Sequence, residues 1–214
     1  MIQGLFDRVA PLWRAAETLG AIIVVNLLLT LTALPVLTFG AGLTATYDTS
    51  RRLQGEDDRG ATRIFLASLR SNLGRATALW ALVAPVGAAI VASWIFLPVP
   101  ELAVLKTLFT LVFVLVFPYV WTVQARFENT VLRTLRNAVV IALARLPYTL
   151  GIAVIHLGIG AIIVATWNLL PQFLAFLLLL GYPLVVFGVT PMMERALAPY
   201  VSAGQADTPG EPQD

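Results

Sequence analysis

The sequence predicts an all-α integral membrane protein, a polytopic bundle of about five transmembrane helices with amphipathic helices at the membrane surface. Of the 214 residues, 58% are hydrophobic and only 12% are charged, about half the charged fraction that is usual in soluble domains. Much of the surface must therefore face lipid. Long charge-free runs also suit helices of about 20 residues, which cross about 30 Å of hydrocarbon. These runs lack the polar–apolar alternation of membrane barrel strands.

The charge-free runs locate the transmembrane spans. We expect a single transmembrane domain over residues 1–200, with spans at about 19–38, 76–97, 102–123, 148–166 and 172–191. The last two spans share one uncharged run that is too long for a single crossing. Trp167, Asn168 and Pro171 mark the break in it, because tryptophan favours the membrane interface and proline is tolerated at a helix start.

Amphipathic helices are expected before and between the spans. Residues 2–16 repeat apolar side chains at helical spacing. This pattern predicts a helix that packs on the bundle, lies among the lipid headgroups, or does both. Residues 43–54, 59–75 and 128–146 have similar patterns, and Gly55 is placed to end the first of these three segments. The polar tail, residues 201–214, is expected to be a disordered cytoplasmic extension.

The arginines predict the orientation in the cell (cytoplasmic) membrane. Segments 39–75 and 124–147 are rich in arginine, whereas the alternate connections near residues 98–101 and 167–171 contain no lysine or arginine. By the positive-inside rule both arginine-rich segments are cytoplasmic. Five spans then place the N-terminus outside and the C-terminus inside. Pro35 leaves open the alternative that the first hydrophobic segment re-enters the membrane instead of crossing it.

The sequence offers little material for catalysis. It has no cysteine and one histidine, His156, and no nucleotide-binding, nucleophile-elbow or zinc-protease motif. We therefore expect no catalytic residues, no metal ion, no cofactor and no enzymatic activity. Nucleic-acid binding is not expected either, because the arginines are not interleaved with stacking aromatic residues.

Three polar side chains are candidates for contacts inside the bundle. Asn26, Asn72 and His156 lie in or beside hydrophobic segments, where a hydrogen bond can join two helices. His156 could instead act as a switch or ligand, and Asn26 could contact a substrate. A packing role is favoured for both. No carboxylate or second histidine lies within helical reach of His156, and a buried asparagine such as Asn26 can join two helices by a hydrogen bond.

Several motifs resemble the YesL-like family of bacterial membrane proteins, which contain a domain of unknown function. The opening motif is Leu34-Pro35-Val36-Leu37-Thr38-Phe39-Gly40-Ala41, followed by Ala45-Thr46-Tyr47. Later matches are Arg126-Phe127-Glu128-Asn129-Thr130 and Gly181-Tyr182-Pro183-Leu184. The resemblance covers about residues 5–197. It implies an association with carbohydrate uptake systems of the ABC type, and it assigns no binding or catalytic residue.

The signature residues Pro35, Thr38, Gly40 and Ala41 predict a turn at the membrane surface. Pro35 would end or kink the first span, and Gly40 with Gly42 would permit a tight turn. Thr38 or Thr44 would cap the following helix.

The sequence leaves two functions open. The first is an accessory or interaction protein whose partners are the lipid bilayer and ABC transporter subunits, with a homo-oligomer also possible. The alternative is a small-solute transporter or channel. Asn26, Thr30 and His156 favour the alternative, as does the similarity between residues 68–72 and 134–137, because transporters often contain internal repeats.

Overall fold

A computed structural model describes residues 3–55, 57 and 59–206 of the chain. This part contains helices and no strand, which confirms the all-α fold class. The elements are α1 (Gln3–Ala33), α2 (Phe39–Gln54), α3 (Ala61–Phe96), η1 (Pro100–Leu102), α4 (Ala103–Arg126), α5 (Val131–Ala144), α6 (Leu146–Leu169), η2 (Pro171–Phe173) and α7 (Leu174–Ala206). Five of the helices are long and apolar enough to cross a membrane, so the chain is a multi-pass membrane protein.

The helices are longer than the predicted spans because amphipathic segments continue into them. α3 joins the predicted surface helix at 59–75 to the span at 76–97 in one helix of 36 residues. α1 ends at Ala33, earlier than the predicted 38, because Pro35 disfavours a helical conformation at the preceding residue. α7 extends to Ala206, so residues 201–206 of the predicted tail are helical. Residues 207–214, and the side chains of the predicted apolar face at 2–12, lie outside the described residues.

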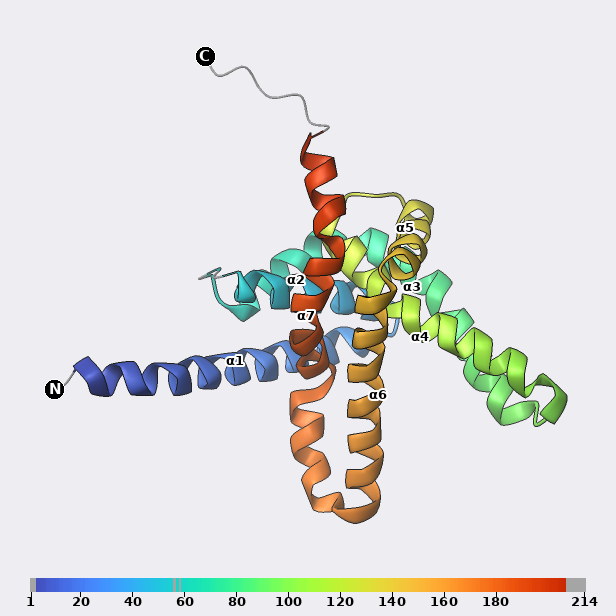
Figure 1. Cartoon of the computed structure of the whole chain (residues 1–214), viewed down its shortest axis with the longest axis horizontal. Coiled ribbons are helices and arrows are strands. Elements are labelled where there is room, and N and C mark those ends of the chain that lie inside the picture. The colour runs from blue at the N-terminus through green and yellow to red at the C-terminus, as the bar shows by residue number, and fades with distance from the viewer. Residues whose placement is uncertain (1–2, 56, 58, 207–214) are drawn as a thin grey trace.

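Helix α2 lies at the centre of the fold, with α1, α3, α4 and α7 in contact with it (Figure 1). Every residue from Gly40 to Ser50 is buried, although this stretch contains threonines, a serine and an aspartate. The hydroxyl groups of Thr44 and Thr46 donate to the carbonyl oxygens of Gly40 and Gly42 at 2.9 Å. These bonds satisfy the hydroxyl protons inside the helix and reduce the cost of burying them.

The connection between α1 and α2 differs from the turn predicted for the signature. Gly40 and Gly42 lie inside α2, and the turn at residues 34–38 is formed around Val36, whose φ is 58°. The predicted cap is also wrong. The hydroxyl of Thr38 donates to the Thr32 carbonyl at 2.6 Å, and that of Thr44 bonds within α2, so neither side chain caps the helix.

The two signature glycines serve close helix packing instead. A Cβ at Gly40 would lie 2.5 Å from the Cβ of Trp80 and 2.6 Å from the Ala76 carbonyl oxygen, both on α3. A Cβ at Gly42 would lie 2.1 Å from the hydroxyl of Thr32 on α1. The glycines therefore let the backbone of α2 approach two neighbouring helices.

The remaining helices project away from this centre in different directions. α3 and α4 form one hairpin, α6 and the first part of α7 form a second, and α1 extends from a third side (Figure 1). The outer parts of these arms carry exposed apolar side chains, such as Phe96 and Val104. A surface of this kind is stable only in an apolar environment.

Candidate functional site

The candidate site is a polar centre where α1, α2, α6 and α7 meet. It begins with a break in α7 at Gly181, whose φ of 55° and ψ of −158° only glycine adopts without strain. The break leaves backbone carbonyl groups without their usual helical donors. Pro183 adds to this, since it has no N–H to offer the carbonyl of Leu179 four residues before it.

Asn26 of α1 supplies the missing donors. Its side-chain Nδ2 donates to the carbonyl oxygens of both Leu178 and Leu179, at 2.9 Å in each case. The amide also lies against the glycine, because a Cβ at Gly181 would be only 2.1 Å from the Oδ1 of Asn26. Asn26 therefore holds α1 against the broken segment of α7.

A line of three polar side chains follows the break. The hydroxyl groups of Tyr182 and Tyr47 are 3.0 Å apart, and the Tyr182 hydroxyl is 3.5 Å from Nε2 of His156. Nδ1 of His156 lies 2.8 Å from the Ile152 carbonyl oxygen. A carbonyl oxygen can only accept, so Nδ1 carries a proton. In the neutral imidazole Nε2 is then the acceptor, and the line runs from Tyr47 through Tyr182 to His156.

A second polar contact joins α3, α4 and α5 around Gln124, which is buried. Its Nε2 donates to Oδ1 of Asn72 at 3.0 Å, and the hydroxyl of Thr134 donates to its Oε1 at 3.4 Å. Asn72 and Thr134 belong to the two similar segments noted in the sequence. Gln124 thus connects the two arginine-bearing helices that these segments form.

In the C-terminal part of α2, an aspartate forms ion pairs with two arginines of the same helix. The carboxylate of Asp48 is buried and accepts from Nη2 of Arg51 at 2.6 Å and from Nε of Arg52 at 2.9 Å. The next polar residues reach α7. Ser50 hydrogen-bonds to the Thr190 hydroxyl at 2.8 Å, and Gln54 Nε2 donates to the Phe187 carbonyl at 2.9 Å.

The three polar residues predicted from the sequence are thus placed in two regions. Asn26 and His156 both belong to the polar centre, where Asn26 lies against Gly181 and His156 against Tyr182, whereas Asn72 lies in the Gln124 contact. Sequence reasoning missed Asp48, Tyr47 and Gln124. The spacing of Asp48 to Arg51 and Arg52, three and four residues apart on one helix, was the available signal for the first.

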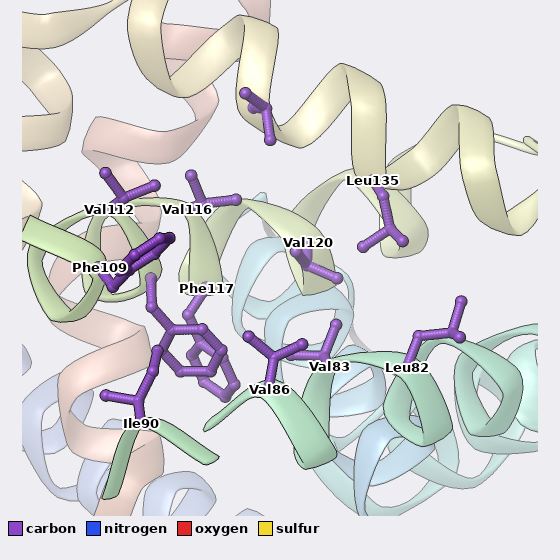
Figure 2. Close-up of a pocket in the computed structure, with 12 residues that line it drawn as sticks. Leu82, Val83, Val86, Ile90, Phe109, Val112, Val116, Phe117, Val120 and Leu135 are labelled. Atoms are coloured by element: carbon purple, nitrogen blue, oxygen red, sulfur yellow. The ribbon is translucent and has the colours of Figure 1, made fainter. Parts of the chain in front are cut away.

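The cavities beside these groups differ in size and polarity. A small cavity of about 10 Å³ lies between α2, α4 and α7 and is lined by Tyr47, Thr190 and Glu194. It has room for about one water molecule. Between α3, α4 and α5, a cleft of about 260 Å³ is lined only by apolar residues, and the side chains drawn in Figure 2 contain carbon alone. A third cavity, of about 330 Å³, reaches His156 and Tyr182.

The loop between α2 and α3 contains a separate ion pair at the surface. Both Nε and Nη2 of Arg59 donate to the carboxylate of Asp57. These hydrogen bonds lower the pKa of Asp57 to about 2. Within the described residues, no group of three or more histidines, cysteines, aspartates and glutamates could hold a metal ion.

Comparison with known proteins relates one part of the chain to a family. The model of a family described as a protein of unknown function, DUF624, matches residues 22–94. No curated protein matches the chain, and no solved structure matches it. The matched segment runs from the inner half of α1 through α2 and most of α3, and so includes Asn26, Gly40, Asp48 and Asn72. In this segment the chain is similar to a family of unknown function.

Proposed function

We propose that this chain is a non-enzymatic accessory protein of the cytoplasmic membrane, and that its partner is an ABC-type carbohydrate uptake transporter. The observation that supports a partner role is that Asn26, Asp48 and Gln124 have their hydrogen-bond partners within the protein. Asn26 donates to two carbonyl groups of α7, and Asp48 forms ion pairs with two arginines. Gln124 hydrogen-bonds to Asn72 and Thr134. These polar groups bond to one another, and the cavity beside Tyr47 has room for about one water.

The choice of partner rests on the YesL-like resemblance. The DUF624 match is consistent with an uncharacterised family of this kind. The link to sugar uptake comes from the resemblance.

A docking surface for the partner is offered by exposed arginines on α3 and α5. Arg63, Arg70 and Arg75 lie on α3 and Arg133 and Arg136 on α5, all of them exposed. None of the five has an ion-pair partner among the described residues. The Gln124 contact brings the two helices together. This supports placing both arginine-rich segments on one side of the membrane, which the positive-inside rule makes the cytoplasmic side.

Affinity capture in mild detergent tests this proposal. The tagged protein should recover a transport subunit, and deletion of the protein should lower sugar uptake. Replacing Arg133 and Arg136 by glutamine should reduce recovery. Arg59→Gln is the matched control, because Arg59 is an exposed arginine already paired with Asp57. The proposal fails if no transport subunit is recovered and uptake is unchanged by the deletion.

Transport by the chain itself is the second candidate, and the break in α7 favours it. Transporter sites are often formed by discontinuous helices whose free backbone groups contact substrate. Here the break leaves the carbonyl groups of Leu178 and Leu179 without helical donors, and both accept a hydrogen bond from Asn26. A transport role would require Asn26 to move away from them.

A further inference from the structure

The cavity between α4, α6 and α7 has the composition of a small-molecule site. Phe113, Phe117 and Leu157 form apolar walls, and His156 and Tyr182 are the residues of the lining that carry polar side-chain atoms. Its volume of about 330 Å³ falls in the range of about 300–1,000 Å³ that is usual for ligand pockets. His156 is ten residues from the start of α6, about 15 Å along the helix, and so lies near the middle of this 24-residue helix.

The cavity opens toward the apolar exterior of the molecule. Leu157 on its rim is 64% exposed, and Val154, one turn earlier on α6, is 67% exposed. An entering molecule therefore comes from the lipid phase, and most of its surface must be apolar.

The polar atoms in the cavity have unused hydrogen-bonding capacity. The 3.5 Å between the Tyr182 hydroxyl and Nε2 of His156 is well beyond the usual 2.7–3.2 Å or so for such bonds. Nε2 has no other hydrogen-bond partner among the described residues, because the second ring nitrogen is the one that bonds Ile152. Weakly bonded polar groups in an apolar environment are costly, so a ligand that completes their bonds gains affinity.

We propose that this cavity binds a lipid-phase molecule with an apolar body and one hydroxyl group, such as a long-chain alcohol or phenol. The hydroxyl donates to Nε2 of His156 and accepts from the hydroxyl of Tyr182. It thereby extends the line that starts at Tyr47. A hydrocarbon chain offers neither bond, and an ether can accept but cannot donate to Nε2.

The apolar cleft in Figure 2 provides a comparison within the same protein. Leu82, Val86 and Phe109 line it, and no polar side chain contributes to it. A molecule that binds there gains nothing from a hydroxyl group. The two sites should therefore respond differently to the same pair of probes.

Photolabelling of the full-length protein in nanodiscs tests the proposal. One probe is a 16-carbon alcohol with a diazirine in its chain, and the other is its methyl ether. Mass spectrometry of the labelled peptides compares the two sites. We expect about tenfold more labelling by the alcohol than by the ether around His156 and Tyr182, the gain from about one hydrogen bond. Labelling of the Figure 2 cleft should be equal for the two probes.

Variants assign the preference to the named atoms. His156→Leu should abolish the preference for the alcohol, His156→Gln should retain part of it through its side-chain oxygen, and Tyr182→Phe should reduce it without changing the cavity shape. Tyr148→Phe, on the same helix but outside the cavity, is the control. Equal labelling by the two probes, or a preference that survives both His156→Leu and Tyr182→Phe, would overturn the proposal. The first result would mean that ordinary acyl chains fill the cavity.

Discussion

At residue scale, the contact between Asn26 and Gly181 controls the path of α7. The glycine permits a backbone conformation that other residues avoid, and the asparagine satisfies the carbonyl groups that the break exposes. Each residue depends on the other. Without the break the Asn26 amide would have no carbonyls to bind, and without Asn26 those carbonyls would be unpaired in an apolar region.

Substituting Gly181 by alanine tests this contact. The new Cβ would be strained by the positive φ and would lie 2.1 Å from Oδ1 of Asn26. We expect a loss of stability of about 1–3 kcal/mol from the strained backbone alone, measured by thermal unfolding in detergent. Gly188→Ala is the matched control on the same helix, because nothing lies within 4 Å of its Cβ position. Equal stability of the two variants would contradict this account of Gly181.

The Asp57–Arg59 pair gives a pH-dependent prediction at the same scale. The lowered pKa means that the carboxylate stays charged until the pH falls to about 2. Any stability that the pair contributes is present above the ordinary aspartate pKa of about 4 and is lost as the pH falls through the lowered value.

Replacing Arg59 by glutamine should raise the pKa of Asp57 toward about 4, measured by NMR of the labelled carboxyl carbon in a pH titration. Arg63→Gln should leave the midpoint of this titration unchanged, because Arg63 is not among the groups that shift it. An unchanged midpoint in Arg59→Gln would show that the ion pair does not form.

At element scale, α2 organises the fold because it is a short, polar helix that α1, α3, α4 and α7 all contact. The hydroxyl groups of Thr44 and Thr46 donate to carbonyls of the same helix, and glycines lie where neighbouring helices approach most closely. Its carboxylate, Asp48, is buried with two arginines that reach the surface. The helix can therefore occupy the centre of an apolar protein without leaving this charge unpaired.

The packing of α2 on α3 is tested by Gly40→Ala. The added methyl group would overlap the Trp80 side chain and the Ala76 carbonyl, neither of which can move without shifting α3. We expect destabilisation of about 1–3 kcal/mol, the usual cost of overpacking, measured by thermal unfolding. Gly20→Ala on α1 has open space at its Cβ position and should not destabilise the protein. A wild-type stability for Gly40→Ala would mean that α2 and α3 are farther apart than described.

Local patterns explain which parts of the fold were predictable. The spans could be predicted because they are runs of apolar residues. An end or kink of the first span near Pro35 could be predicted because proline disfavours a helical conformation at the residue before it. The contact between Asn26 and Leu178 joins residues 152 positions apart, and no local pattern specifies it. Gly40 and Gly42 suggested a turn because glycine serves both turns and close packing, and only the positions of Trp80 and Thr32 decide between these roles.

At the scale of the whole molecule, the arginine-bearing parts of α3 and α5 lie close together. Gln124 links the arginine-bearing parts of α3 and α5. The last part of α7 contacts the end of α4, where the Glu194 carboxylate is 3.5 Å from Arg126. The ends of the two hairpins, which carry no arginine, point away from this region (Figure 1). By the positive-inside rule, this asymmetry predicts a cytoplasmic location for the arginine-rich end and the C-terminus.

Single cysteines test this orientation, since the chain has none of its own. With an impermeant thiol reagent on intact cells, a cysteine at residue 3 should be labelled if the N-terminus is outside. Leu132→Cys, on the exposed face of α5, should be labelled only after the membrane is permeabilised. Protection of residue 3 would contradict five full crossings and favour re-entry of the first segment.

Solute flux in liposomes tests the central claim, that the polar groups of this protein close its core and do not line a passage. The purified protein should give no flux above empty liposomes across a broad panel of sugars, ions and amino acids. Asn26→Ala, which frees the α7 carbonyls, provides a variant in which a latent passage would be easiest to detect. Flux through the wild-type protein that Asn26→Ala or His156→Leu alters would contradict the account and establish transport as the function.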